Sequence, residues 1–343
     1  MKTVESIQPL DPRALCARIQ AGEAFAESVK TALNARGQAQ EALFEIAREA
    51  RLSGFPDRRA EVRSVIEISN ICKQRCNYCN IGCEDTQKYV IPSDDLVEIA
   101  AFLHHERGRR VLLLQSGENK DRRFVANVIR ACAQIKDRLP DIQLIGCIGN
   151  LSRDQYRAMR EAGVDRYLLK IEASNPVLYE AAKPHDTWSE RRQCLDDLLE
   201  LGFMVGSGII VGLPGQTEDD LVGDLRFLSE LDLDMVSASV FIPGHGTVYE
   251  HEPRGDVETT LNFMALLRIL NPNALMPTTS SLEKLKADGQ YLGLMAGANT
   301  LTVHDGTPQA FQHLFPIYDD TRYRPNDDHL RAIAERAGLV VPA

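Results

Sequence analysis

Three cysteines stand close together in the segment from residue 66 to 83, IEISNICKQRCNYCNIGC. Cys72, Cys76 and Cys79 form a C-x3-C-x2-C pattern directly after a run rich in aliphatic residues. Thiolates at this spacing suit a soft metal or an iron–sulfur cluster. A structural zinc site commonly takes further ligands from a distant second pair, and no Cys–Cys or His–His pair at zinc spacing follows. Three ligands on a cluster of four irons would leave one iron open to another group, while a zinc knuckle remains the alternative.

Composition and charge narrow the class of protein. Of the 343 residues, 44% are hydrophobic and 26% are charged, which is typical of a globular chain with a large core. The formal net charge of −10 disfavours generic binding to nucleic acids or anionic membranes, so we expect neither as a partner. No apolar run approaches the ~20 residues of a membrane helix, and the first residues show no apolar signal segment. We therefore expect a cytoplasmic protein whose eight cysteines serve metal or redox chemistry rather than disulfides.

Short aliphatic runs alternate with amphipathic segments from residue 63 onward. This alternation favours parallel strands joined by right-handed crossovers, and eight such units in about 240 residues match a (βα)8 TIM-type barrel. An open doubly wound sheet is the alternative. The eight expected strands are Val65–Ser69, Val111–Gln115, Ile142–Cys147, Arg166–Ile171, Val205–Val211, Met235–Phe241, Leu275–Pro277 and Thr300–Val303.

Helical segments flank the alternating region. Residues 11–53 have apolar residues at helical spacing, and Gly37 separates two expected helices. We predict an N-terminal helical extension (1–60), a barrel (61–323) and a C-terminal closing helix (324–343). The cysteine loop then follows the first strand and lies at the carboxyl-end mouth of the barrel, where the active sites of this fold lie.

The cysteine loop and the end of the second strand resemble the radical S-adenosylmethionine (SAM) superfamily. An aromatic residue, Tyr78, precedes the third cysteine, and Ser116-Gly117-Glu118 is similar to the Gly-Gly-Glu motif of that family. The resemblance implies that Cys72, Cys76 and Cys79 hold a 4Fe-4S cluster whose open iron binds SAM. One electron then cleaves SAM to a 5′-deoxyadenosyl radical. The chemistry belongs to the cofactors, and the protein binds, orients and shields them.

The same resemblance assigns roles to further residues at the mouth. The backbone of Ser116, Gly117 and Glu118 receives the SAM ammonium, Glu172 bonds the ribose hydroxyls and Arg191 pairs with the SAM carboxylate. Leu213, within Gly212-Leu213-Pro214-Gly215, lies near the adenine, and Tyr78 packs against the adenine or the cluster. The alternatives are a solvated loop charge at Glu172, a surface arginine at 191, with Arg192 as its rival, and an ordinary βα turn at Leu213.

Segments further along the chain are similar to the biotin-synthase-like branch of the superfamily. Leu213-Pro214-Gly215-Gln216-Thr217 and Pro277-Thr278-Thr279 carry this likeness, which covers roughly residues 40–320. Within the branch, the chain most resembles the maturases that process an iron–cysteine precursor of the iron–iron hydrogenase cofactor, and next the methylornithine synthases. No cysteine follows Cys194, so the second C-terminal cluster of some maturases is not expected.

Four residues are predicted to contact a small-molecule substrate. Thr278 and Thr279 end the seventh strand, where hydroxyls could hold an anion. Lys170 lies on the same side of its strand as Glu172, because side chains alternate along a strand. Lys170 and Phe311 stand where the maturases have an arginine and a tyrosine, and Ser237 and Ser281 stand where the methylornithine synthases have charged residues. A paralogue with a distinct small substrate therefore remains an alternative.

The sequence does not settle the roles of the remaining cysteines and histidines or the class of the reaction. Cys132, Cys147 and Cys194 lie within helix or strand patterns and are predicted to be core thiols, while Cys83 is left without a role. His304 is one of three histidines in loops at the expected mouth that could contact a substrate. The family resemblance implies a reduced flavodoxin or ferredoxin as electron donor. The alternatives to a radical enzyme are a zinc or cysteine-nucleophile enzyme and an iron–sulfur scaffold in cofactor assembly.

Overall fold

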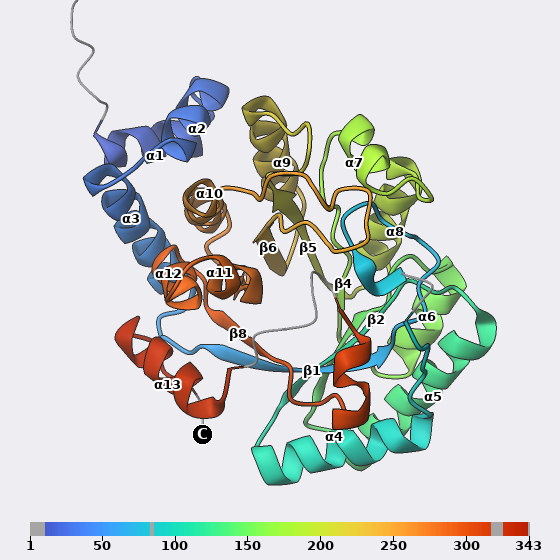
Figure 1. Cartoon of the computed structure of the whole chain (residues 1–343). Helices are drawn as coiled ribbons and strands as arrows, with labels where there is room; N and C mark the ends of the chain where they lie inside the picture. Colours follow the sequence, from blue (N-terminus) through green and yellow to red (C-terminus); the bar gives the residue numbers. More distant parts are fainter. Residues whose placement is uncertain (1–10, 83–85, 317–324, 342–343) are drawn as a thin grey trace, which may run out of the picture.

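The computed structural model describes residues 11–82, 86–316 and 325–341. Eight parallel strands alternate with helices around a central axis (Figure 1). The strands are hydrogen-bonded in the order β6-β5-β4-β3-β2-β1-β8-β7, and a parallel bridge between Met235 and Leu275 joins the region before β7 to β6. The sheet is therefore a nearly closed barrel, which confirms the predicted (βα)8 TIM-type fold.

The strands have the following bounds: β1 (Glu61–Ser69), β2 (Val111–Ser116), β3 (Gln143–Cys147), β4 (Arg166–Leu168), β5 (Met204–Val211), β6 (Met235–Val240), β7 (Pro277–Thr278) and β8 (Thr300–Val303). Three of them differ from the prediction by two residues or more, and β1 begins four residues earlier than expected. β4 ends three residues early because the chain leaves regular pairing on its way to Glu172, which is joined to β5 only by a bridge to Ile209. β7 begins two residues late and has two residues, since the bridge at Leu275 is isolated from it.

The outer ring of helices closes over the apolar outside of the sheet. Between the strands lie α4 (Ser93–Arg107), α5 (Arg122–Arg138), α6 (Arg153–Glu161), α7 (Pro176–Ala182), α8 (Trp188–Glu200), α9 (Glu218–Glu230), α10 (Val257–Leu270), α11 (Ser280–Leu285) and α12 (Gly289–Met295). A short 3-10 helix at Asn80–Gly82 follows β1, and another at Gln309–Leu314 follows β8. Side chains cap several of these helices, as Ser152 and Thr217 do in capping boxes. None of the helices in the described part of the chain is long and apolar enough to cross a membrane.

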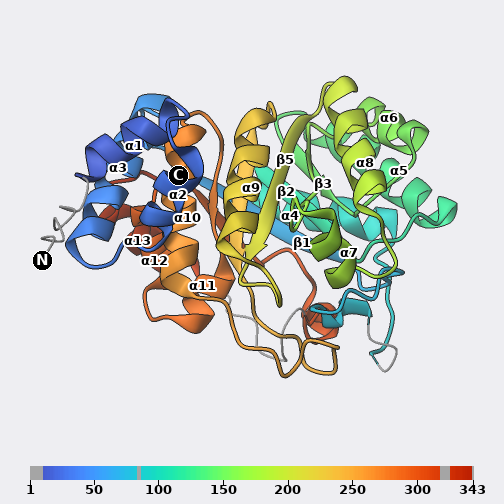
Figure 2. The same ribbon diagram turned by 90° about the horizontal axis from the view of Figure 1, so that it is seen from above.

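Three helices, rather than the expected two, precede the barrel: α1 (Pro12–Gln20), α2 (Phe25–Leu33) and α3 (Gln38–Gly54). Residues 21–24 break the first helical pattern, and Ala24 takes a left-handed conformation with φ 43°. Figure 2 shows these helices grouped on one side of the barrel, beside α10. The buried Arg51 of α3 donates to the carbonyl oxygens of Leu294 and Ala298 at 2.7 and 2.8 Å. The last helix, α13 (Asp327–Arg336), lies on the same side.

The barrel interior is layered along its axis. At the amino-terminal end, the carboxylate of Glu61 accepts hydrogen bonds from Arg63 and Arg166. The next layer is apolar and consists of inward side chains of five strands, together with Leu275 from the isolated bridge before β7. The strand residues are Val65, Val111, Leu113, Ile145, Leu168 and Met235. Beyond it, toward the carboxyl ends of the strands, the interior opens. The layers therefore leave the mouth of the barrel as the hollow end.

Candidate active site

A cavity of about 350 Å³ lies inside the barrel and extends from the carboxyl-end mouth down to Arg63. This volume lies in the usual range for a small-molecule site. Its wall contains predicted residues from five parts of the chain: the cysteine loop, the end of β2, the segment after β4, α8, and the residue after β7. Residues far apart in the sequence are thus brought to one chamber, as the barrel fold predicts.

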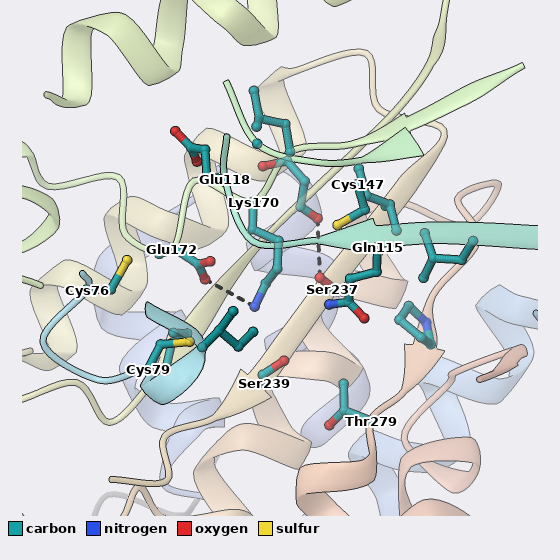
Figure 3. Close-up of a pocket in the computed structure, with 18 of the residues that line it drawn as sticks. Cys76, Cys79, Gln115, Glu118, Cys147, Lys170, Glu172, Ser237, Ser239 and Thr279 are labelled. Carbon is teal, nitrogen blue, oxygen red and sulfur yellow. Dashed lines mark hydrogen bonds and ion pairs between the residues drawn. The ribbon is translucent and has the colours of Figure 1, made fainter. Parts of the chain in front are cut away.

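The three cysteines of the loop after β1 all line this cavity. Figure 3 shows Cys76 and Cys79 with their sulfurs at its edge. Burial raises the pKa of the Cys76 thiol to about 11 and also raises that of Cys79. Among the described residues no three His, Cys, Asp or Glu side chains form a group around a single ion position, and none of the described cysteines is in a disulfide.

A glycine fixes the cysteine loop against the end of β2. A Cβ atom added at Gly117 would lie 2.6 Å from the carbonyl oxygen of Ile71 and 2.7 Å from Cys72 Cβ. The Gly117 amide donates to Ser69 and the Lys73 amide to Glu118, both through backbone atoms. Cys72 can therefore approach the second strand only because position 117 carries no side chain. Three thiols beside this close backbone contact fit a thiolate-bound iron–sulfur cluster in their donor chemistry.

Buried charges link the end of β2 to α7 and α8. Arg191 donates to Glu118 at 2.8 Å and to Asp186 at 3.0 Å, while its Nε donates to the Tyr179 hydroxyl at 2.8 Å. Lys183 lies 3.2 Å from Asp186 and 3.7 Å from Glu118. Burial opposes the charge of Arg191, but the surrounding Glu118, Tyr179 and Asp186 hold its pKa above the ordinary value. These partners keep Arg191 charged beside the cavity.

Glu172 has an unusual backbone at the mouth. Its φ of 60° is left-handed, a conformation that costs free energy for a residue with a side chain. Backbone bonds to Gly208 and Ile210 of β5 hold it there. Its carboxylate lies 3.1 Å from Lys170 Nζ, and both side chains line the cavity (Figure 3). The prediction that these two residues face the interior is confirmed.

Three predicted contact residues, Leu213, Thr278 and Phe311, do not line the cavity. Thr278 is fully buried and donates to the Gln290 carbonyl of α12 at 2.8 Å, because neighbouring strand residues face opposite ways and Thr279 takes the inward position. Phe311 stacks on Tyr89 with ring centroids 4.6 Å apart. Leu213 packs in an apolar cluster beneath the mouth loops. Tyr78 and Ser116 do line the cavity, and Cys83 lies outside the described residues.

The structure also places in the cavity wall residues that were not among the predicted site residues. Cys147, predicted to be a core thiol, lines the cavity with Gln115, Ser237 and Lys183. Strand alternation from the aliphatic Ile145 could have shown that Cys147 points inward. His304, one of three open candidates, also lines the cavity and lies 3.2 Å from Glu67. Cys132 and Cys194 are buried in the outer core, as predicted.

Comparison with known proteins decides the family. The model of the radical SAM superfamily matches residues 66–228. The [FeFe] hydrogenase maturase subunit HydE of Thermotoga maritima is 36% identical over 315 residues, which cover 89% of this chain and 87% of that protein. The chain belongs to the radical SAM superfamily. As a radical SAM enzyme it uses a 4Fe-4S cluster and SAM, which it cleaves reductively to a 5′-deoxyadenosyl radical, with an electron donor and a substrate.

Other known proteins are similar to this chain in part of the sequence or in the whole fold. The biotin synthase of Gloeothece citriformis is 26% identical over 260 residues, which cover 71% of this chain and 70% of that protein. The structure of methylornithine synthase (PylB) has a TM-score of 0.82 at 23% identity and covers 96% of this chain and 97% of its own. The structure of the hydrogenase maturase HydG of Carboxydothermus hydrogenoformans has a TM-score of 0.79 at 18% identity and covers 96% of this chain and 78% of its own. The two structural likenesses support the complete barrel fold.

Proposed function

We propose that this radical SAM enzyme acts on a small molecule held in the barrel, in a reaction related to hydrogenase cofactor maturation. The observation that carries the proposal is the single cavity lined by the three loop cysteines, the charged end of β2 and the Lys170–Glu172 pair. The sequence identity to HydE over most of the chain supports the maturation role. The resemblance implies an iron–cysteine precursor as the type of substrate.

Within this proposal, the cysteine loop holds the cofactor. Cys72, Cys76 and Cys79 are the thiolate ligands, and their protons leave when the metal binds. Gly117 keeps the loop against β2. The cluster supplies the electron that cleaves SAM. The protein around it excludes water and holds the cluster and SAM in a fixed position relative to each other.

The charged residues at the mouth bind SAM. The backbone of Ser116, Gly117 and Glu118 receives the ammonium, and Arg191 pairs with the carboxylate. Arg191 is suited to this task since Glu118 and Asp186 bond only its Nη2 atom and Tyr179 its Nε atom, whereas no hydrogen bond in the described part of the chain uses Nη1. Glu172 binds the ribose hydroxyls from its left-handed position. Tyr78 borders the same chamber and packs on the adenine or the cluster.

The deeper part of the chamber takes the substrate. Lys170 and Thr279 present a cation and a hydroxyl to it. The maturases have an arginine at this position, whose planar guanidinium can donate two parallel hydrogen bonds. The ammonium group of Lys170 is a compact charge, so the substrate is bound with a different geometry. We propose a reduced flavodoxin or ferredoxin as the electron donor and a cytoplasmic, oxygen-poor setting, because an open cluster is sensitive to oxygen.

Anaerobic reconstitution of the full chain tests the reaction class. We expect about four irons and matching sulfide per chain, with 5′-deoxyadenosine and methionine released from SAM under dithionite. Zinc without iron would instead support a hydrolytic or cysteine-nucleophile enzyme. A cluster that passes to acceptor proteins while SAM stays intact would support a scaffold.

A second assay tests the substrate class. The rate of 5′-deoxyadenosine release is measured with ferrous iron plus L-cysteine, with L-cysteine alone and with L-lysine. Faster release with the iron–cysteine mixture than with either amino acid is expected. Acceleration by lysine alone would favour an amino-acid mutase related to the methylornithine synthases, and would contradict the maturation role.

A further inference from the structure

A fourth thiol faces the same cavity. Cys147 is the last residue of β3 and is in register with Gln115 of β2. Figure 3 shows its side chain inside the barrel beside Gln115 and Ser237, across the chamber from Cys76 and Cys79. None of the hydrogen bonds among the described residues uses its sulfur atom, and the proposed binding of cluster and SAM gives it no role.

A second side chain indicates that a ligand extends past Cys147 into the chamber. Arg63 lines the deep end of the cavity and is 1% exposed. Its Nε donates to Glu61 at 2.6 Å, while Nη2 has no hydrogen-bond partner among the described residues. An unpaired buried N–H of a guanidinium is costly unless an acceptor is supplied. The chamber is therefore built to receive a group with an acceptor atom at its deep end.

The strand register sets Cys147 between that deep end and the mouth. Residues 67, 115 and 147 share one level of the sheet, whereas Arg63 lies four residues nearer the amino-terminal end of β1. Four residues of strand correspond to about 13 Å. A ligand that reaches from the mouth toward Arg63 passes the Cys147 sulfur.

We propose that Cys147 donates a hydrogen atom to a carbon radical formed in this cavity. The S–H bond breaks homolytically, the hydrogen atom goes to carbon to form a C–H bond, and a thiyl radical remains on sulfur. One electron from the same class of reductant that reduces the cluster and one proton from solvent restore the thiol. The step is favourable because an S–H bond is weaker than most C–H bonds. It rests on the proposed radical chemistry and adds the residue that ends it.

The surroundings of Cys147 keep the hydrogen on sulfur. Burial raises the pKa of this thiol to about 11, even though the nearby Lys170 acts in the opposite direction. The thiol is therefore protonated at neutral pH. Cys132 is a fully buried thiol in the outer core, away from the cavity, and so provides a control cysteine that no ligand in the cavity touches.

The test uses SAM itself as the probe and needs no substrate. The reconstituted full chain is incubated with SAM and dithionite in D2O, and the mass of the released 5′-deoxyadenosine is measured. Because a thiol exchanges its proton with solvent, we expect one deuterium in the product of the wild type. Cys147→Ser should lose the label, since an O–H bond is too strong to replace S–H, and Cys132→Ser should keep it.

Further arms separate the possible failures. Cys147→Ala repeats the test with a second variant, and the iron content of each variant shows whether the site is intact. Unlabelled product from the wild type, or undiminished label in both Cys147 variants, would overturn the role of Cys147 while leaving reductive SAM cleavage in place. Release of no 5′-deoxyadenosine by iron-loaded wild type would overturn the proposed function, and this inference with it.

Discussion

The two ends of the barrel interior both bury charge, but they do so in different ways. At the amino-terminal end, one carboxylate, Glu61, lies between two arginines, Arg63 and Arg166, beneath an apolar layer. At the mouth, Glu118, Glu172 and their cationic partners line an open chamber. The backbone differs too, since β1 is regular at Glu61 whereas Glu172 has a positive φ. We infer that Glu61 and Arg166 serve mainly to specify the barrel, whereas the residues at the mouth bind ligands. Arg63 belongs to both ends, since it pairs with Glu61 and also lines the deep end of the cavity.

The largest effect should come from the thiol loop at the mouth. Cys76→Ser should lose the cluster, and 5′-deoxyadenosine formation should fall to background, because a hydroxyl is a poor ligand for iron in such a cluster. The melting temperature of the protein without iron should be unchanged, since Cys76 is only partly buried. Iron analysis and product chromatography measure this, with Cys132→Ser as control. Full iron content in the Cys76 variant would remove Cys76 from the ligand set.

The amino-terminal end should respond in stability instead of binding. Glu61→Gln leaves Arg63 and Arg166 facing each other without a carboxylate, and removing one partner of a buried ion pair typically costs about 3–5 kcal/mol. We expect a loss of that size in the free energy of unfolding by urea. The affinity of the folded protein for SAM should stay the same. A weakened affinity with unchanged stability would reverse the proposed division between the two ends.

Substitution of Glu172 should weaken the binding of SAM instead of the stability of the fold, and the loss of free energy should be smaller than for Glu61. Glu172→Ala removes a charge-assisted hydrogen bond to SAM, worth roughly 1.5–3 kcal/mol of affinity, measured by calorimetry on the reconstituted protein. Lys170→Met is the control, because it breaks the same ion pair and leaves the carboxylate in place. Equal losses in the two variants would mean that the pair, and not Glu172 itself, matters for SAM.

The smallest effect concerns a carboxyl that supports the loop after Glu172. Asp224 on α9 accepts from the Ser174 amide, and burial raises its pKa to about 6 from 3.8. A raised pKa in the folded state favours folding at low pH, and this contribution is lost as pH rises through 6. The stability of wild type relative to Asp224→Asn should therefore fall by about 2 kcal/mol between pH 4.5 and 7.5. A stability difference between the two proteins that stays constant or grows as the pH rises would refute the raised pKa of Asp224.

The same contrast shows what the sequence could and could not reveal. The alternation of aliphatic and amphipathic segments predicted the strands. The alternation of side chains within a strand correctly predicted that Lys170 and Glu172 face the barrel interior. Thr278 and Thr279 carry the same hydroxyl, so composition alone could not separate the inward one from the one bonded to α12. Phe311 was assigned by position in a motif, but its stacking on Tyr89 joins segments more than two hundred residues apart.

The ion pairs of the amino-terminal end were also invisible in the sequence. Glu61 and Arg166 come from strands on opposite parts of the barrel, and only its closure brings them together. Cys147 was expected in the core since buried thiols usually pack there. Its place in the cavity follows from the layering of the interior, which depends on all eight strands.

The central claim is that the thiol loop at the mouth leaves one iron available to the methionine end of SAM. Electron paramagnetic resonance of the dithionite-reduced cluster, recorded with and without SAM, tests it most directly. We predict that SAM changes the spectrum of the wild type. A fully loaded cluster with an identical spectrum under saturating SAM would contradict the account.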